Sequence, residues 1–143
     1  MKKKDKTYHS SEDRIPQYVS EPEMLYAVRQ NKITTDYLSD LKEMSGLKDE
    51  TLSDSLNMNI KTFRSYKMTP LPMKPHLQEH VFAMLSLYQH GIQIFGSYKK
   101  FNEWMEKTNF FFDNDKPISF LTTISGIKHI DNRLTAMQYG DNV

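Results

Sequence analysis

The residues best suited to do chemistry in this sequence form a short basic segment in which cationic and hydroxyl side chains alternate. If residues 60–67 form a helix, Ile60 and Phe63 take its apolar side and leave the other side polar. These polar residues, which we predict to be DNA-binding, are Lys61, Thr62, Arg64, Ser65 and Lys67. Arg and Lys pair with phosphates and guanine edges, and Ser and Thr donate to backbone oxygens. The segment therefore predicts a helix that contacts DNA.

The distribution of charge along the chain agrees with this prediction. Residues 55–78 carry four Lys and Arg and no acid, whereas residues 7–54 carry ten acids against five Lys and Arg. Residues 103–143 carry a net charge of −2, and the whole chain of 143 residues carries only +1. A polyanion is attracted to the middle of such a chain and repelled by its flanks. The alternative is a solvated basic face that binds nothing.

Two short helices are expected to position the basic segment. The apolar spacing predicts helices over 47–56 and 60–67, and Asn57-Met58-Asn59 interrupts them. Asparagine can adopt the left-handed conformation in the turn, and Asn59 can cap the second helix. This layout predicts a helix-turn-helix. The alternative is a degenerate helix-turn-helix, in which the two helices only support the fold and do not bind DNA.

The remaining apolar pattern is helical throughout. Pro75 can open the longest helix, Gly96 can end it, and Gly126 can break the chain between two later helices. The expected elements are helices over 21–32, 34–46, 75–95, 97–107, 117–124 and 127–139, and a loop over 109–116. No apolar run approaches the roughly 20 residues that span a bilayer, and there is no cysteine. We therefore expect a cytoplasmic protein with no membrane segment.

The predicted fold class is all-α. We expect an N-terminal helix-turn-helix bundle, joined by a long helix to a small C-terminal helical domain. The predicted divisions are a disordered or loose arm at 1–20, the helix-turn-helix domain at 21–74, the connecting helix at 75–96 and the C-terminal domain at 97–143. The prolines at 69–75 are expected to stiffen the connection.

Two acidic or histidine-containing patterns are weaker candidates for metal sites. His76, Glu79 and His80 match the H-x-x-E-H pattern of zinc peptidases, but no third ligand is evident. Polar residues in the first turn of a helix are ordinary. The run 113–115 is too short for a calcium loop. No phosphate loop or nucleophile motif is present, so we expect no enzyme, no metal and no cofactor.

Three consecutive aromatic residues, Phe110, Phe111 and Phe112, interrupt the predicted loop. They cannot all point inward from one loop. Either one or two of them anchor the core, or one is exposed as an anchor for a partner.

The C-terminal third resembles the toxin-binding domain of the Xre/MbcA/ParS antitoxins. The resemblance rests on Phe95-Gly96, Trp104, Pro117-Ile118, Leu121, Gly126, Leu134 and Tyr139-Gly140. Two departures from the family pattern lie in the region that the resemblance implies faces the toxin. Many relatives have glycines where this chain has 113–116, and many have an arginine at the position of Ala136, whereas Arg133 stands one turn earlier here.

The resemblance implies a protein that binds a cognate toxin encoded by the adjacent gene, commonly of the RES class that attacks NAD. It implies that these residues face the toxin: Phe111, Asp115, Lys116, Pro117, Arg133 and Tyr139. It also implies a helix-turn-helix that binds operator DNA, so that the antitoxin of this type II system represses its own promoter. Weak binding by one basic helix would require a homodimer or a hetero-oligomer with the toxin. The alternative is a stand-alone transcription regulator whose C-terminal domain serves dimerisation.

Overall fold

The computed structural model describes residues 21–69 and 72–140, and its regular elements in those ranges are all helices. They are α2 (Glu21–Arg29), α3 (Asp36–Ser45), α4 (Asp49–Ser55), α5 (Ile60–Met68), α6 (Pro75–Phe95), α7 (Tyr98–Met105), η1 (Phe110–Phe112), η2 (Pro117–Thr122) and α8 (Ile124–Gln138). The predicted all-α class is confirmed. The arm predicted at 1–20 lies outside the described residues.

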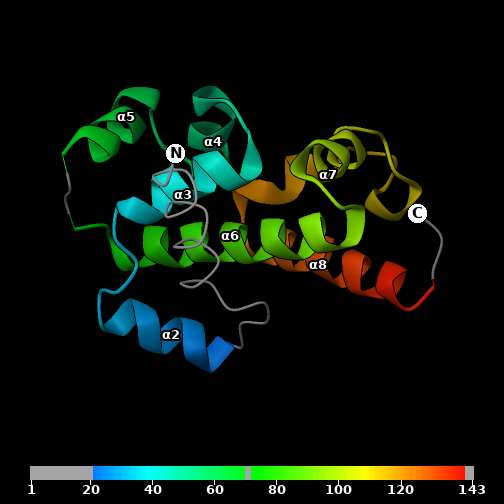
Figure 1. Ribbon diagram of the computed structural model, residues 1–143, viewed down its shortest axis with the longest axis horizontal. Helices are drawn as coiled ribbons and strands as arrows, with labels where there is room; N and C mark the ends of the chain where they lie inside the picture. The colour runs from blue at the N-terminus through cyan, green and yellow to red at the C-terminus, as the bar shows by residue number, and fades with distance from the viewer. Residues whose placement is uncertain (1–20, 70–71, 141–143) are drawn as a thin grey trace, which may run out of the picture.

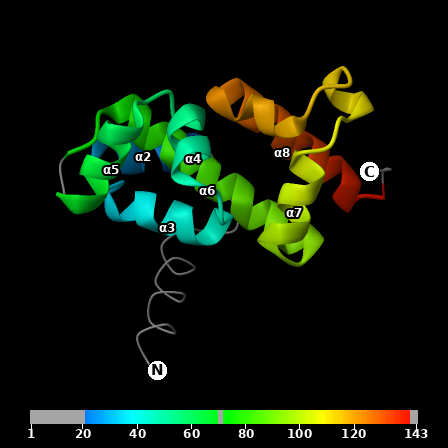
Figure 2. The ribbon, with the colours of Figure 1, turned by 90° about the horizontal axis from the view of Figure 1, so that it is seen from above.

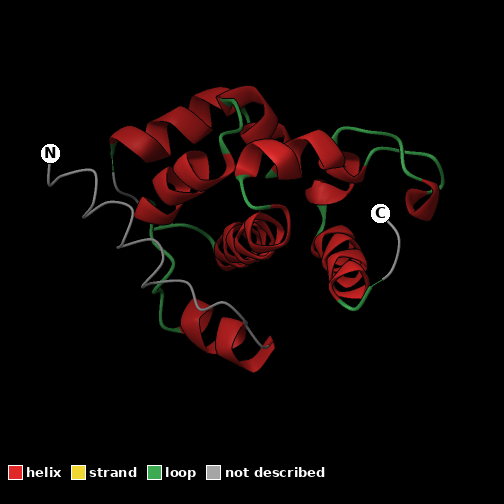
Figure 3. Cartoon of the chain, turned by 45° about the vertical axis from the view of Figure 1, so that its right-hand side comes forward, coloured by secondary structure: helices red, strands yellow, loops and turns green. Residues whose placement is uncertain are grey.

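The long helix α6 is the centre of the fold. It contacts α2, α3, α7 and α8, and Figure 1 shows these helices around it. Seen from above, α2 to α5 gather over one end of α6, and α7 and α8 over the other (Figure 2). Helix α8 runs beside α6, and both are seen nearly end-on in Figure 3. The helix starts at Pro75 and ends at Gly96, which adopts the left-handed conformation with φ 90°, as predicted.

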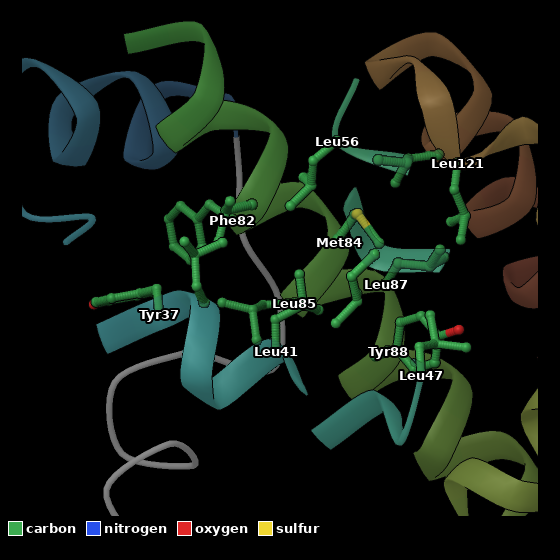
Figure 4. Close-up of a cluster of buried hydrophobic side chains, with 14 of the residues drawn as sticks. Tyr37, Leu41, Leu47, Leu56, Phe82, Met84, Leu85, Leu87, Tyr88 and Leu121 are labelled. Carbon is green, nitrogen blue, oxygen red and sulfur yellow. The ribbon is translucent and has the colours of Figure 1, made fainter. Parts of the chain in front are cut away.

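A single hydrophobic core crosses the predicted domain boundaries. Leu56, at the end of α4, and Leu121, in η2, belong to the same buried cluster as Met84 and Leu87 of α6 (Figure 4). Each of these four side chains is at most 4% exposed. The two ends of the molecule are therefore held in one packed body, and the boundaries at 74 and 96 stay a prediction.

Helices α4 and α5 are joined by a tight turn that the two asparagines stabilise. Asn57 adopts the left-handed conformation with φ 57°, and its side chain donates to the carbonyl oxygen of Thr122 at 2.8 Å. The side chain of Asn59 caps α5 by accepting from the backbone N–H of Lys61 at 2.7 Å. Phe63 is fully buried beneath the turn. The predicted cap is confirmed, and Asn57 also attaches the turn to η2.

The predicted break at Gly126 is wrong. Helix α8 begins at Ile124, so Gly126 lies inside its first turn and is buried. The helix starts earlier because the hydroxyl oxygen of Thr123 accepts from the backbone N–H of Gly126 at 2.9 Å. The threonine cap sets the start of the last helix.

Candidate functional site

The first candidate surface is the outer side of α5. Lys61, Thr62, Arg64 and Ser65 are exposed there, and Phe63 turns inward. Lys67 is also at the surface, with 29% of its side chain exposed. The structure thus brings all five predicted DNA-binding residues to the solvent side of one helix.

An acidic residue at the start of α4 neutralises part of this surface. Asp49 lies 3.0 Å from Lys42 Nζ, 3.2 Å from Arg64 Nε and 3.5 Å from Lys67 Nζ. The hydrogen bond from Lys42, followed by that from Arg64, lowers the pKa of Asp49 to about 2. The carboxylate is therefore ionised at neutral pH. The sequence does not predict this cluster, because nothing in the local pattern joins residue 49 to residues 64 and 67.

The histidine pattern at the start of α6 has a structural role. His80 is buried, and its Nε2 lies 2.7 Å from the carbonyl oxygen of Leu121. Burial lowers the pKa of His80 below its ordinary value, so the neutral ring donates from Nε2 to this oxygen. His76 is exposed. Within 21–69 and 72–140 no three His, Asp or Glu side chains form a group that could hold a metal ion.

The second candidate surface rests on an aromatic cluster between α6, α7 and η1. Phe101, which is fully buried, stacks on Phe95 and Trp104, with ring centroids 5.7 and 6.1 Å apart. Trp104 in turn meets the ring of Phe112 edge-on at 5.9 Å. The cluster fixes the loop that carries η1 to the central helix.

Hydrogen bonds to one residue close that loop. The backbone N–H of Asn109 donates to the carbonyl oxygen of Asp115, and the N–H of Asn114 donates to that of Asn109, each at 3.0 Å. The side chain of Asn109 accepts from the N–H of Phe111, also at 3.0 Å. Phe112 is buried at the base of the loop. The structure therefore answers the question left open by the aromatic run, because Phe112 anchors the core while Phe110 and Phe111 are exposed.

The residues implied to face the toxin divide into exposed and buried positions. Phe111, Asp115, Lys116 and Tyr139 are exposed, whereas Pro117 and Arg133 are buried. Arg133 in α8 lies over the ring of Phe111, with Cζ 3.4 Å from the ring centroid. The structure thus joins Phe111 to Arg133, and Asp115 and Lys116 follow on the same loop. Their contact with a toxin stays a prediction.

Comparison with known proteins identifies this end of the molecule. Residues 90–140 match the family model of the antitoxin Xre/MbcA/ParS C-terminal toxin-binding domain. This end of the chain is the toxin-binding domain of an Xre/MbcA/ParS-type antitoxin. The resemblance found in the sequence is confirmed, and the family indicates a regulator with a toxin as partner rather than an enzyme. No curated protein matches the antitoxin.

In the described part of the antitoxin, no helix is long and apolar enough to cross a membrane.

Within the matched region, His90 of α6 ties the antitoxin's last helix to its central one. Its Nδ1 lies 2.7 Å from Asp131 Oδ1, and its Nε2 lies 3.0 Å from the side-chain oxygen of Gln138. Both partners accept, so the protonated ring satisfies both. The hydrogen bond to Asp131 raises the pKa of His90 above its ordinary value, although burial opposes the shift. His90 is therefore a stabilising contact between α6 and α8 when it is charged.

This contact predicts a pH dependence. A folded-state pKa above the unfolded value means that the contribution of His90 is full below about pH 6.5 and is lost as the pH rises through the folded pKa. We expect a loss of about 1 kcal/mol at alkaline pH, because Asp131 is partly exposed and water screens the pair. The measurement is thermal unfolding of the wild type and of His90→Gln across this range.

The comparison with His90→Gln is necessary because His80 has the opposite effect on the pH dependence. The lowered pKa of His80 makes stability fall with decreasing pH, and this contribution is the same in both proteins. The difference between the two unfolding profiles therefore isolates His90. Parallel profiles would show that His90 does not stabilise the antitoxin by its charge.

Proposed function

We propose that this antitoxin neutralises its toxin with the loop at 109–115 and the start of η2, and binds operator DNA with α5. The observation that carries the proposal is the match of residues 90–140 to a toxin-binding domain. The loop and α5 lie at opposite ends of the molecule (Figures 1 and 2), so one chain can hold both ligands at once.

On the toxin side, the exposed groups suit a cationic partner. Residues 103–143 carry a net charge of −2, and Asp113 and Asp115 are exposed on the loop. A RES-like toxin that binds NAD needs a cationic mouth for the phosphates of that dinucleotide. The antitoxin covers this mouth and thereby excludes the substrate, and it supplies surface rather than catalysis.

On the DNA side, α4 and α5 act as a helix-turn-helix in which α5 contacts the major groove. The side chains of Arg64 and Lys67 both pair with Asp49 and are only partly exposed to solvent. One copy of α5 therefore offers few contacts to DNA phosphates. Specific binding therefore requires a homodimer or a complex with the toxin. Such a complex represses its own promoter, and the protein acts in the cytoplasm, where operator and toxin are both present.

The substitution Arg64→Ala tests the division of labour. We expect affinity for the DNA upstream of the gene to fall about tenfold and the salt dependence to become shallower by about one unit, because one phosphate contact is lost. Affinity for the toxin should not change. The measurements are fluorescence anisotropy with the upstream DNA and calorimetry with the product of the adjacent gene.

Lys32→Ala is the matched control, since it removes one exposed cation that follows α2, outside the predicted DNA surface and outside the residues matched to the toxin-binding domain. It should leave both affinities unchanged. Loss of DNA and toxin binding together in Arg64→Ala would indicate misfolding and contradict the division. A different outcome is that the wild type binds the upstream DNA, does not bind the product of the adjacent gene and does not rescue growth from it. In that case the protein is a stand-alone regulator and its C-terminal domain serves dimerisation.

A further inference from the structure

We infer that Phe110 is the main anchor of the toxin interface and enters an apolar pocket of the toxin from a loop that already has its bound shape. This inference rests on the proposed toxin binding and adds a residue that was not among the predicted contacts. Phe110 is 78% exposed. It lies in the region that matches the toxin-binding domain.

The exposure of Phe110 follows from the geometry of its own loop. Phe112 occupies the buried position, against Trp104 and Phe120, with ring centroids 5.9 and 5.2 Å away. Phe111 lies against the guanidinium of Arg133. The only ring contact of Phe110 within the described residues is an edge-on one with Phe111 at 5.5 Å. The loop therefore presents one large apolar side chain that the fold itself does not use.

Four hydrogen bonds of Asn109 hold the backbone of the loop next to this side chain. Asn109 bonds to the backbone of Phe111, Phe112, Asn114 and Asp115 at 3.0 Å in each case. An anchor on a preorganised loop loses little conformational entropy on binding, so more of its burial contributes to affinity. Truncating an aromatic anchor in the centre of an interface commonly has the largest effect of any single residue there.

The charges around Phe110 indicate the chemistry of the pocket. Asp113 and Asp115 are exposed on the same loop, and Lys116 follows them. Carboxylates at the rim of an interface attract cations on the partner. The partner is therefore a toxin that has an apolar pocket large enough for a phenyl ring, with Lys or Arg at the edge of that pocket.

The test is the affinity of Phe110→Ala for the product of the adjacent gene, measured by calorimetry on the full chain. We expect affinity to fall about thirtyfold or more, with the melting temperature unchanged because the side chain is exposed. Phe110→Leu should recover part of the loss, since it restores apolar volume. Tyr26→Ala is the matched control: this aromatic is 63% exposed on α2, outside the matched residues, and its loss should not affect toxin binding.

The outcomes separate this inference from the proposed function. Wild-type binding that Phe110→Ala leaves unchanged would overturn the anchor and leave the proposed toxin binding intact. An equal loss in Tyr26→Ala would also overturn it, because the effect would not be specific to the loop. If the wild type does not bind the adjacent gene product, both the proposed function and the anchor are wrong.

Discussion

Gly126→Ala is expected to destabilise the antitoxin by about 3 kcal/mol, which is at the upper end for overpacking. A Cβ at this position would collide with the backbone carbonyl oxygen of Phe120. A backbone oxygen cannot move aside as a side chain can, so η2 must shift away from α8. Urea denaturation gives the free energy of unfolding that checks this value.

The neighbouring substitution Ser125→Ala is the control for Gly126→Ala. Ser125 is exposed in the same turn of α8. The free energy of unfolding of the Ser125→Ala variant should therefore stay within about 0.5 kcal/mol of the wild-type value. Equal effects of the two substitutions would mean that η2 and α8 are not in close contact at Gly126. The close approach of η2 to α8 also explains why glycine stands at position 126. A residue without a Cβ is required there for space, and not to break a helix.

The helices could be predicted because their start and stop signals are local. Pro75 opens α6, Gly96 closes it, and Asn59 caps α5, each by a property of one residue and its nearest neighbours. The start of α8 is also set by a local signal. Thr123 caps this helix, and a prediction that places the boundary at Gly126 overlooks that cap.

Two residues of the loop adopt a backbone conformation that glycine favours. Asp113 and Asn114, at positions where the resemblance to the family leads one to expect glycine, have φ values of 55° and 62°. Asp and Asn tolerate the left-handed region better than other residues with a side chain. The loop therefore has a backbone that glycine adopts easily, and it carries an exposed carboxylate at Asp113.

Contacts between distant residues could not be predicted from the sequence. Asp49 reaches Arg64 and Lys67 only because α4 and α5 fold against each other. Similarly, Asn102 accepts from the hydroxyl of Tyr88 and donates to the carbonyl oxygen of Ser45, which links α7 to α6 and α3. Such pairs have no periodicity in the sequence, and the ion pairs of Asp49 with Arg64 and Lys67 decide how much charge the predicted DNA surface retains.

Phe112→Ala is expected to destabilise the antitoxin by about 3–5 kcal/mol, the range for losing a buried phenyl ring. Phe112 is 1% exposed, whereas Phe111 is 44% and Phe110 is 78% exposed. The same substitution at these three successive positions should therefore have a decreasing effect on the free energy of unfolding from Phe112 to Phe110. Chemical denaturation measures the three values on one scale.

The sole tryptophan gives a second measurement on the same variants. Trp104 is 7% exposed and meets the ring of Phe112 edge-on, so Phe112→Ala should admit water and shift its emission to longer wavelength. Phe110→Ala should leave the emission unchanged. A Phe112→Ala variant with wild-type stability and emission would contradict the attachment of the loop to the aromatic cluster.

Together the variants Phe112→Ala and Phe110→Ala separate effects on folding from effects on binding. Because Phe112 holds the loop and Phe110 is presented by it, Phe112→Ala should reduce toxin affinity only through loss of the folded loop. Its affinity should therefore recover in part under stabilising conditions, such as added osmolyte, which favour burial. Phe110→Ala should show no such recovery, since its fold is already intact. Recovery of both variants, or of neither, would show that the two phenylalanines do not have separate roles.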